Sequence, residues 1–209
     1  MPFKFKTRRR VPHAGNPRAV HILQAAKHVF LRDGATGFSG RTVAAEAGVS
    51  LGSLQHFFPS MDGLLAAMLE YVVNEYDEGY EQALLKLPLS AEARLRAVVE
   101  YLIADIWRPE TRQFFFGLWA LGCHNKFARQ LIGEMYEYHR HNLAAFIAAV
   151  RADLPEQQCL DIAMQVAAMI DGSMIFTGAR GRRAPSMSEY SEQLAQGVMR
   201  LISTLPASG

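Results

Sequence analysis

The stretch Phe38–Leu64 reads FSGRTVAAEAGVSLGSLQHFFPSMDGL and predicts two short helices joined by a tight turn, followed by the start of a longer helix. Ser39 and Ser50 each stand where a side-chain hydroxyl can cap the free N–H groups at the start of a helix. Gly48, between them, can adopt the left-handed conformation that ends the first helix and turns the chain steeply into the second. The stretch therefore predicts a helix-turn-helix.

The second short helix, Leu51 to Phe57, is about two turns long and is too short to be stable alone in water. We expect Val49, Leu54 and Phe58 to hold it against a core. Its outward side then carries small and hydrogen-bonding side chains with no acidic residue, namely Ser50, Leu51, Ser53, Gln55 and His56. Such a surface fits the major groove of DNA, where glutamine can pair with adenine. An ordinary corner of an all-α protein has the same spacing, so spacing alone leaves both interpretations open.

The charge distribution favours the DNA interpretation. The chain has a net charge of +2, but residues 1–60 contain nine Lys or Arg and two Asp or Glu, a net of +7, and the remainder carries −5. A basic N-terminal third is typical of a protein that contacts the phosphates of double-stranded DNA. A disordered basic tail without a target would explain only the charges of the first ten residues.

Length and composition limit the class of protein. With 209 residues, half of them apolar, the chain can bury a sizeable core as one large domain or two small ones. No apolar run approaches the roughly 20 residues of a membrane-spanning helix and no signal peptide is evident, so we expect a cytoplasmic protein without a membrane partner. Cys123 and Cys159 are isolated, so we expect neither a disulfide nor a cysteine metal site.

Apolar residues recur at helical spacing along the chain, which predicts an all-α protein of about nine helices. Residues 1–17 are expected to be a flexible basic arm. Residues 18–60 are expected to form a three-helix DNA-binding domain, whose first helix ends cleanly at Gly34. Residues 61–209 are expected to form a larger helical body for ligand binding and dimerisation.

The last two predicted helices, Pro155 to about Gly178 and Met187 to Leu205, carry more apolar surface than one chain can cover. Such a pair suits a symmetric four-helix interface with a second copy of the chain. We therefore expect a homodimer. The basic loop between the two helices is expected to be solvated.

A small-molecule site is expected in the helical body. Residues 109–124 are the most aromatic part of the chain and must be buried on most sides or line a cavity, although core packing alone is the alternative. His139 is either a polar contact for a ligand or a half-exposed histidine. Asp171 is either a carboxylate for a ligand with a donor or a positive charge, or a hydrogen-bonded core acid. The candidate ligand-binding residues are Trp107, Phe115, Trp119, Tyr138, His139, Met164 and Asp171.

The sequence contains no arrangement of residues that suits catalysis or metal binding. His139 and His141 point to different sides of a helix, and no nearby carboxylate completes a metal site. Cys123 and His124 are adjacent and diverge, and no set of nucleophile, base and acid comes together. We expect no metal, no cofactor and no enzyme activity.

The run Thr42–Leu54, TVAAEAGVSLGSL, followed by Phe57-Phe58-Pro59-Ser60 and by Leu64, resembles the DNA-binding signature of TetR-family transcriptional regulators. The resemblance covers about residues 18–65, and the helical remainder is similar in length to that of the family. It implies a dimer through the last two helices. It also implies DNA contacts from Arg41, Thr42, Ser50, Leu51, Gly52, Ser53, Gln55 and His56.

Three positions depart from the family pattern. Gln55 replaces a frequent tyrosine, Phe57 replaces a usual tyrosine or histidine, and Met61 replaces a common lysine that would contact phosphate.

Taken together, the sequence features predict a homodimeric, ligand-responsive repressor that binds a near-palindromic operator and is released by a small apolar or aromatic effector. The alternative is a ligand-binding or scaffold protein of the same fold that has lost specific DNA binding.

Overall fold

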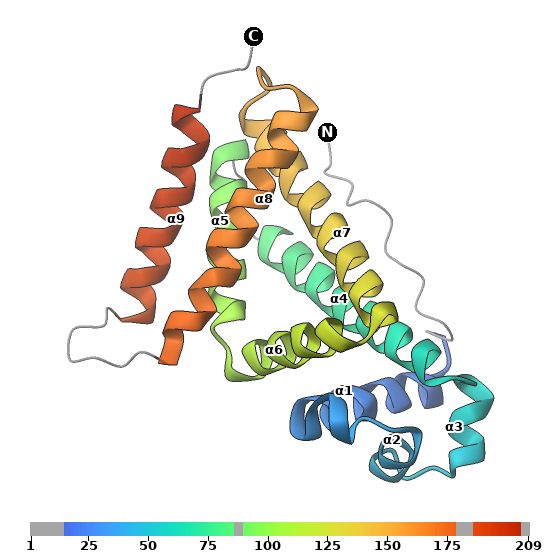
Figure 1. The fold of residues 1–209 in the computed structure, drawn as a ribbon. Coiled ribbons are helices and arrows are strands. Elements are labelled where there is room, and N and C mark those ends of the chain that lie inside the picture. Colours follow the sequence, from blue (N-terminus) through green and yellow to red (C-terminus); the bar gives the residue numbers. More distant parts are fainter. Residues whose placement is uncertain (1–14, 86–89, 179–185, 206–209) are drawn as a thin grey trace. The chain divides into compact units, whose positions relative to one another are not determined.

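The computed structural model describes residues 15–85, 90–178 and 186–205, and every regular element among them is helical (Figure 1). The predicted all-α fold with about nine helices is confirmed. The flexible arm, up to residue 14, and the basic loop 179–185 lie outside the described residues. The helices are α1 (Pro17–Gly37), α2 (Gly40–Glu46), α3 (Leu51–Phe57), α4 (Met61–Leu85), α5 (Ala91–Ile106), α6 (Pro109–His124), α7 (Lys126–Val150), α8 (Glu156–Ser173), the 3₁₀ helix η1 (Met174–Gly178) and α9 (Met187–Thr204).

Serine side chains mark several helix starts. Ser60 Oγ accepts the backbone N–H of Gly63 at the start of α4 (3.0 Å), and Ser90 Oγ accepts that of Ala93 at the start of α5 (3.2 Å). Ser186 and Glu189 form a reciprocal capping box at the start of α9. These caps supply acceptors for N–H groups that have no partner within the helix, which is why the boundaries could be predicted from the sequence.

The predicted clean stop of the first helix at Gly34 was only partly right. Gly34 has φ 65° and ψ −166°, which breaks the helical path, but a further turn follows and α1 ends at Gly37. A Cβ atom on Gly37 would lie 2.3 Å from Cβ of Asp33, so only glycine lets this last turn fold back so closely. The sequence pattern showed the break but not the turn that follows it.

The described residues pack as two compact units. The head unit contains residues 15–78 and 113–135, and the body unit contains the described parts of 79–112 and 136–205. Helices α4, α6 and α7 contribute residues to both units. The division after residue 60 remains a prediction, whereas the packing joins residues 61–78 and 113–135 to the three N-terminal helices.

In the head unit, α1 lies at the centre of the core. The ring of Phe30 makes edge contacts with Phe38 (centroids 5.7 Å apart) and with Phe114 of α6 (5.4 Å). A Cβ atom on Gly117 would lie 3.3 Å from Phe30 Cε1, so α6 approaches α1 closely here. Lys27 of α1 pairs with Glu75 of α4 at 2.7 Å. The helix-turn-helix is therefore held from behind by α4 and α6.

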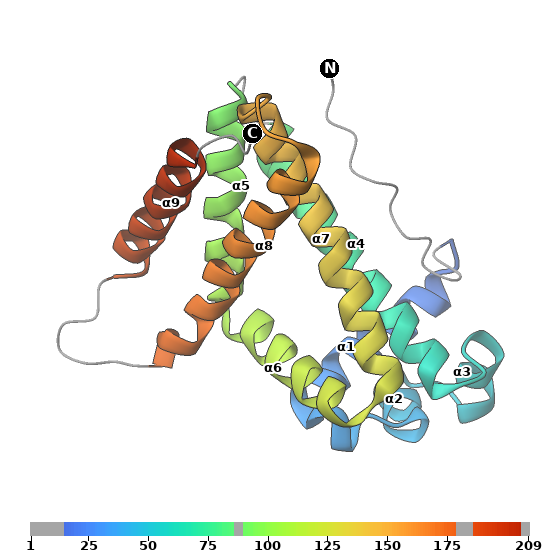
Figure 2. The ribbon, with the colours of Figure 1, turned by 45° about the horizontal axis from the view of Figure 1, so that its top comes forward.

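In the body unit, α5 packs against α8 and α9, and α8 also packs against α9 (Figures 1 and 2). Leu95, Ile103 and Ile162 are fully buried in this core. Arg151, just after α7, donates to the backbone carbonyls of Ile202 and Leu205. The guanidinium thus satisfies carbonyl groups at the C-terminal end of α9 and ties this helix to the end of α7.

The segment Glu156–Phe176, which spans α8 and the start of η1, is long and apolar enough to cross a membrane by length and composition. The expectation that no segment approaches this length was therefore too strong. Half of the most apolar stretch is buried in the protein, and α8 packs on α5 and α9. A core helix of a globular domain has the same length and composition, which makes this weak support for a membrane span.

Candidate functional site

The turn between α2 and α3 has the geometry of a helix-turn-helix. Gly48 has φ 63°, and the backbone N–H groups of Val49 and Gly48 donate to the carbonyls of Ala44 (3.0 Å) and Ala45 (3.1 Å). This hydrogen-bond pair is the Schellman motif that ends a helix at a left-handed glycine. The ring Nε2 of His21 lies 3.1 Å from the Ala47 carbonyl and connects the turn to α1. The predicted role of Gly48 is confirmed.

The start of α2 is fixed by a reciprocal cap between Ser39 and Thr42. Ser39 Oγ accepts the backbone N–H of Thr42 (3.2 Å), and Thr42 Oγ1 accepts the backbone N–H of Ser39 (3.0 Å). The Thr42 hydroxyl also lies 2.7 Å from the Gly37 carbonyl, to which it donates. A hydroxyl has one proton, so Thr42 cannot donate to an external phosphate while this hydrogen bond is intact.

The outward side of α3 carries most of the residues expected to contact DNA. Ser50, Gly52, Gln55 and His56 are exposed, whereas Leu54 and Phe58 are buried as expected. A Cβ atom on Gly52 would find only Ser50 Oγ, at 4.0 Å, so another molecule can approach this backbone closely. This side of α3 contains no acidic side chain.

Leu51 and Ser53 are half-buried rather than fully outward. A Cβ atom on Gly40 would lie 3.3 Å from Leu51 Cδ1 and 3.6 Å from the sulfur of Met61. Leu51 thus lies against the first turn of α2, and Met61 at the start of α4 lies against the same turn. The sequence did not predict this contact, because helical periodicity does not show which neighbouring helix covers the edge of a short one.

The positive charges of α1 and α2 fall into two groups. Lys27 is paired with Glu75, and Arg32 is paired with Glu46 (2.6 Å) and Asp33 (2.9 Å). The hydrogen bond from Arg32 holds the pKa of Asp33 below its ordinary value. Arg18 and Arg41 are exposed and have no ion-pair partner among the described residues. Of these charges, Arg41 lies at the start of α2, where the resemblance places a DNA contact.

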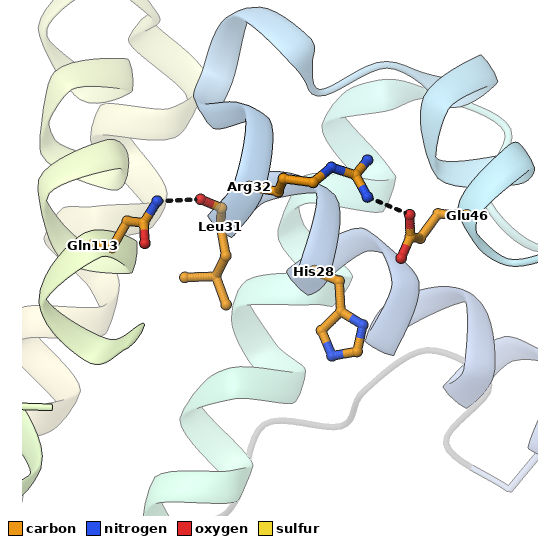
Figure 3. Close-up of a pocket in the computed structure, with 5 residues that line it drawn as sticks. All are labelled: His28, Leu31, Arg32, Glu46 and Gln113. Carbon is orange, nitrogen blue, oxygen red and sulfur yellow. Dashed lines mark hydrogen bonds and ion pairs between the residues drawn. The ribbon is translucent and has the colours of Figure 1, made fainter. Parts of the chain in front are cut away.

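An open hollow of about 310 Å³ lies in the head unit, where α1, α2 and α6 meet (Figure 3). It is lined by His28, Leu31, Arg32, Glu46 and Gln113. Its main polar groups already have partners, since Arg32 pairs with Glu46 and Gln113 Nε2 donates to the Leu31 carbonyl at 2.6 Å. The charged side chains of the hollow are therefore already paired with each other.

The seven residues expected to bind a ligand fall in both units. Phe115 and Trp119 belong to the head unit, with ring centroids 6.0 Å apart, and both are half-buried. Between them in the sequence, Phe116 exposes 42% of its surface, so the aromatic helix is not buried on all sides. Trp107 belongs to the body unit, where its indole N–H donates to Ser173 Oγ (3.0 Å) and its ring stacks on Tyr190 (4.9 Å).

Asp171 and His139 are the two polar candidates of the body unit. The Asp171 carboxyl is hydrogen-bonded to the hydroxyl of Tyr136 on α7, and burial raises the pKa of Asp171 to about 6. Burial lowers the pKa of His139 to about 4. Both residues are half-buried rather than fully enclosed.

Tyr138 is half-buried, and Met164 exposes 55% of its surface on the outer side of α8. Tyr136 was not among the candidates from the sequence. Its position three residues before His139, on the same side of a helix, was the available signal. In the described part of the chain, His, Cys, Asp and Glu side chains do not gather in threes as a metal site would require.

Comparison with known proteins agrees with this geometry. Residues 22–68 match the model of bacterial regulatory proteins of the tetR family, and residues 91–203 match the model of the C-terminal region of BetI-type transcriptional repressors. A helical head with a helix-turn-helix followed by such a region defines a DNA-binding transcriptional regulator. The chain belongs to the TetR family, and its C-terminal region is of the BetI type.

Two curated relatives have similar sequences. The chain is 29% identical to PksA, an HTH-type transcriptional regulator of Bacillus subtilis (strain 168), over 109 residues that cover 52% of this chain and 53% of PksA. It is 28% identical to BetI, an HTH-type transcriptional regulator of Escherichia coli O139:H28 (strain E24377A / ETEC), over 142 residues that cover 67% of this chain and 71% of BetI. The match thus spans about half the length of PksA.

Solved structures show the same fold. A transcriptional regulator from Pseudomonas aeruginosa PAO1 has a TM-score of 0.73 at 20% identity, over 90% of this chain and 91% of that chain. A regulator from Saccharomonospora viridis in complex with choline has a TM-score of 0.66 at 21% identity, over 89% and 95%. FadR from Bacillus subtilis in complex with stearoyl-CoA has a TM-score of 0.69 at 16% identity, over 86% and 97%.

Proposed function

We propose that this chain is a homodimeric repressor that binds a near-palindromic operator through α3 and the start of α2, and that a small molecule bound in the body unit releases it. The observation that carries the proposal is the exposed, acid-free side of α3 beside Arg41, which has no ion-pair partner among the described residues. Membership of the TetR family supports the same function.

The chemistry of this surface suits sequence-specific binding. Gln55 offers an amide that can pair with adenine in the major groove, and His56 offers a ring nitrogen as donor or acceptor. Gly52 lets the backbone come close to the base edges. Arg41 is available for a phosphate, whereas Lys27 and Arg32 have their charges engaged within the protein. Direct readout by α3 with phosphate binding at α2 is therefore the proposed division of roles.

The outer side of α8 supports a dimer. Met164, Met169, Ile175 and Phe176 are exposed large apolar side chains on α8 and η1. A Cβ atom on Gly197 of α9 would lie 4.0 Å from Met169 Cε, so the apolar surface continues from α8 to α9. A second copy of the chain, related by a two-fold axis, can cover this surface with its own α8 and α9. Met164 fits this interface better than a ligand site within one chain.

The release mechanism is a population shift. The effector binds more tightly to the form in which the two DNA-binding heads are separated, and so shifts the population towards that form. Operator affinity then falls, by at most the ratio of the effector's affinities for the two forms. Helices α4, α6 and α7 each contribute residues to both units, so they are the proposed route between the effector and α3. The ligands named for the structural relatives, choline and stearoyl-CoA, differ widely in chemistry, so they do not define the effector of this chain.

The test is selection of duplexes from a random pool, followed by fluorescence anisotropy of the selected sequence. We expect two similar half-sites about one helical turn apart, or a multiple of it, and specific binding about 10³-fold or more above random duplex. The double variant Arg41→Ala, His56→Ala should lose at least about tenfold in affinity and show a shallower salt dependence. Arg94→Ala, which removes an exposed arginine of α5, is the control and should leave binding unchanged.

Binding that ignores sequence, or that survives in the double variant, would overturn the proposal. One observation favours the alternative, a ligand-binding protein of this fold without specific DNA binding. Met61 occupies the first position of α4, where the family commonly has a phosphate-binding lysine, and the Thr42 hydroxyl is engaged in the cap. Under that alternative the selection returns no enriched sequence, while small-molecule binding by the body unit persists.

A further inference from the structure

Gln113, near the start of α6, supplies a hydrogen-bond donor to the end of α1. Its side-chain Nε2 donates to the backbone carbonyl of Leu31 at 2.6 Å. The helical path of α1 breaks at Gly34, which has φ 65° and ψ −166°. The carbonyls of the turn before a helix break generally lack a donor within the helix. The amide of Gln113 thus acts on α1 as a capping side chain does, but from a different helix.

Arg32, the residue after Leu31, joins the end of α1 to the end of α2. Asp33 accepts from Nε and Nη2 of Arg32, both at 2.9 Å, and this bidentate contact orients the planar guanidinium. Nη1 contacts the carboxylate of Glu46 at 2.6 Å. Glu46 is the last residue of α2, where a carboxylate is unfavourable, and the last turn of α2 contains no basic residue. Arg32 supplies the missing positive charge from α1.

The contacts of Gln113 and Arg32 follow one another from α6 across α1 to the end of α2 (Figure 3). Both border the open hollow of about 310 Å³, so close packing of side chains does not reinforce them on that side. Glu46 stands two residues before Gly48, whose left-handed conformation turns the chain into α3. A shift of α6 at Gln113 therefore reaches the turn that sets the direction of α3.

Other polar contacts also hold α2 on α1. The Thr42 hydroxyl donates to the Gly37 carbonyl at the start of α2, and the ring of His21 meets the Ala47 carbonyl after its end. The contact of Arg32 differs from these, because Arg32 directly follows the carbonyl that α6 holds. An ion pair with an exposed arginine contributes little to overall stability, so its main effect is on the direction of α2.

We infer that Gln113 and Arg32 are positioning residues of the DNA-binding surface. Gln113 holds the last turn of α1 in place, and Arg32 transmits this position through Glu46 to the turn before α3. The inference rests on the proposed function, because it takes α3 as the helix that reads the operator. It names the side chain through which a movement of α6 changes operator affinity.

The decisive variant is Glu46→Gln, for which positioning and simple electrostatics predict opposite results. The change makes the DNA-binding head more positive by one charge, and electrostatics alone then predicts tighter binding to any duplex. If Arg32 positions α2 through Glu46, binding to the selected operator should instead weaken. We expect the ratio of operator affinity to random-duplex affinity, measured by fluorescence anisotropy, to fall at least about fivefold, because both heads of the dimer are altered.

Gln113→Met keeps the length of the side chain and removes the donor to the Leu31 carbonyl, so it should lower the same ratio at least about fivefold. Gln113→His keeps a ring N–H donor and should restore most of the ratio. The methionine change should add little to Glu46→Gln, because residues that act in one line are not additive. Urea unfolding confirms that every variant is folded under the binding conditions.

Two control variants remove matched groups of the head unit. Glu75→Gln makes the same change of charge but breaks an ion pair between α1 and α4, with Lys27, instead of one between α1 and α2. Gln130→Met removes an exposed amide of α7 that donates to Glu134 at 3.1 Å. Both should leave the ratio unchanged. An unchanged ratio in Glu46→Gln or Gln113→Met, additive losses in their combination, or an equal fall in Glu75→Gln would overturn the inference.

Hydrogen exchange of the full chain without DNA separates this inference from the proposed function. Gln113→Met should speed the exchange of peptides containing Gly48 and Val49 at least about threefold, because the end of α2 opens more often, whereas Gln130→Met should not. If no operator is found but exchange changes as expected, the DNA assignment is refuted and the contacts stand. If operator binding is specific but Gln113→Met changes neither exchange nor the ratio, the positioning role alone is refuted.

Discussion

The hydroxyl of Thr42 donates to the backbone carbonyl of Gly37 over 2.7 Å, which joins the start of α2 to the end of α1. The same side chain forms a reciprocal cap with Ser39. A position that the family resemblance assigns to DNA contact is thus also a structural junction. Loss of DNA binding on changing Thr42 would have two candidate causes, and stability measurements separate them.

Thr42→Val should lower the free energy of unfolding by about 1–2 kcal/mol, because it keeps the shape of the side chain and removes the hydroxyl from the cap. Thr42→Ser keeps the hydroxyl and is the control. Both are compared by urea unfolding at fixed protein concentration. Equal stability of the valine variant and the unchanged chain would show that the cap contributes nothing measurable.

Two glycines within helices of the head unit should respond in opposite ways to alanine. A Cβ atom on Gly133, in α7, would meet no other atom within 4 Å, so Gly133→Ala should stabilise the chain by about 0.5–1 kcal/mol through helix propensity. In Gly117→Ala, the new methyl group would lie 3.3 Å from the buried ring of Phe30, and this crowding should cancel the gain. Thermal unfolding of the pair tests the α1–α6 contact, and an equal gain at both positions would contradict it.

Asp171→Asn should make the empty protein more stable at pH 7.5. The pKa of Asp171 is about 6 in the folded state against an ordinary 3.8, so the folded state binds more protons between these values. The stability that this group contributes is therefore greatest below about pH 4 and is lost as pH rises through 6. A shift of about two pKa units corresponds to roughly 3 kcal/mol as an upper limit.

The asparagine variant should show this gain at pH 7.5 and little of it at pH 4, as measured by urea unfolding across the range. A gain of the same size at both pH values would point to packing rather than to the charge of Asp171. No gain at pH 7.5 would mean that the carboxylate is better solvated than the structure indicates.

His139 should change the pH dependence of stability in the opposite direction to Asp171. Burial lowers its pKa to about 4 from an ordinary 6.5, so the folded state binds fewer protons in this interval. Its contribution to stability is present above about pH 6.5 and is lost as pH falls towards 4. His139→Gln should therefore flatten the acid side of the stability profile. If that profile is unchanged, burial does not lower the pKa of His139 in the folded protein.

Met164→Asp should dissociate the dimer, since it places a charge on the exposed apolar side of α8. We expect the dimer dissociation constant from sedimentation equilibrium to rise at least about tenfold, a typical cost for an interface position of this kind. Phe116→Asp changes an exposed apolar residue of the head unit and should leave the dimer intact. An unchanged association in the Met164 variant would place the interface elsewhere.

Local chemistry explains which parts of the fold could be predicted. Ser39, Gly48 and Ser50 are residues whose preferred roles at helix ends depend on a few neighbours, so the helix-turn-helix followed from the sequence. The apolar periodicity of α5 and α9 likewise depends only on the period of the helix. These elements lie where they were expected.

Contacts between residues far apart in the sequence could not be predicted. Nothing local to Phe114 indicates that it meets Phe30, and nothing local to Lys27 indicates that Glu75 neutralises it. The sequence therefore shows only the sum of the basic charge in the N-terminal third, although part of that charge is paired within the protein. The interaction of Asp171 with Tyr136 belongs to the same class, since α7 and α8 are brought together by tertiary packing.

The setting of Trp107 gives the protein an intrinsic optical reporter. Its indole is held by Ser173 at the end of α8 and stacked on Tyr190 near the start of α9, although it caps α5 itself. The chain has one other tryptophan, Trp119, so a Trp119→Phe variant would emit from a single fluorophore. A change in its emission wavelength or quenching would register any rearrangement among three helices without an attached dye.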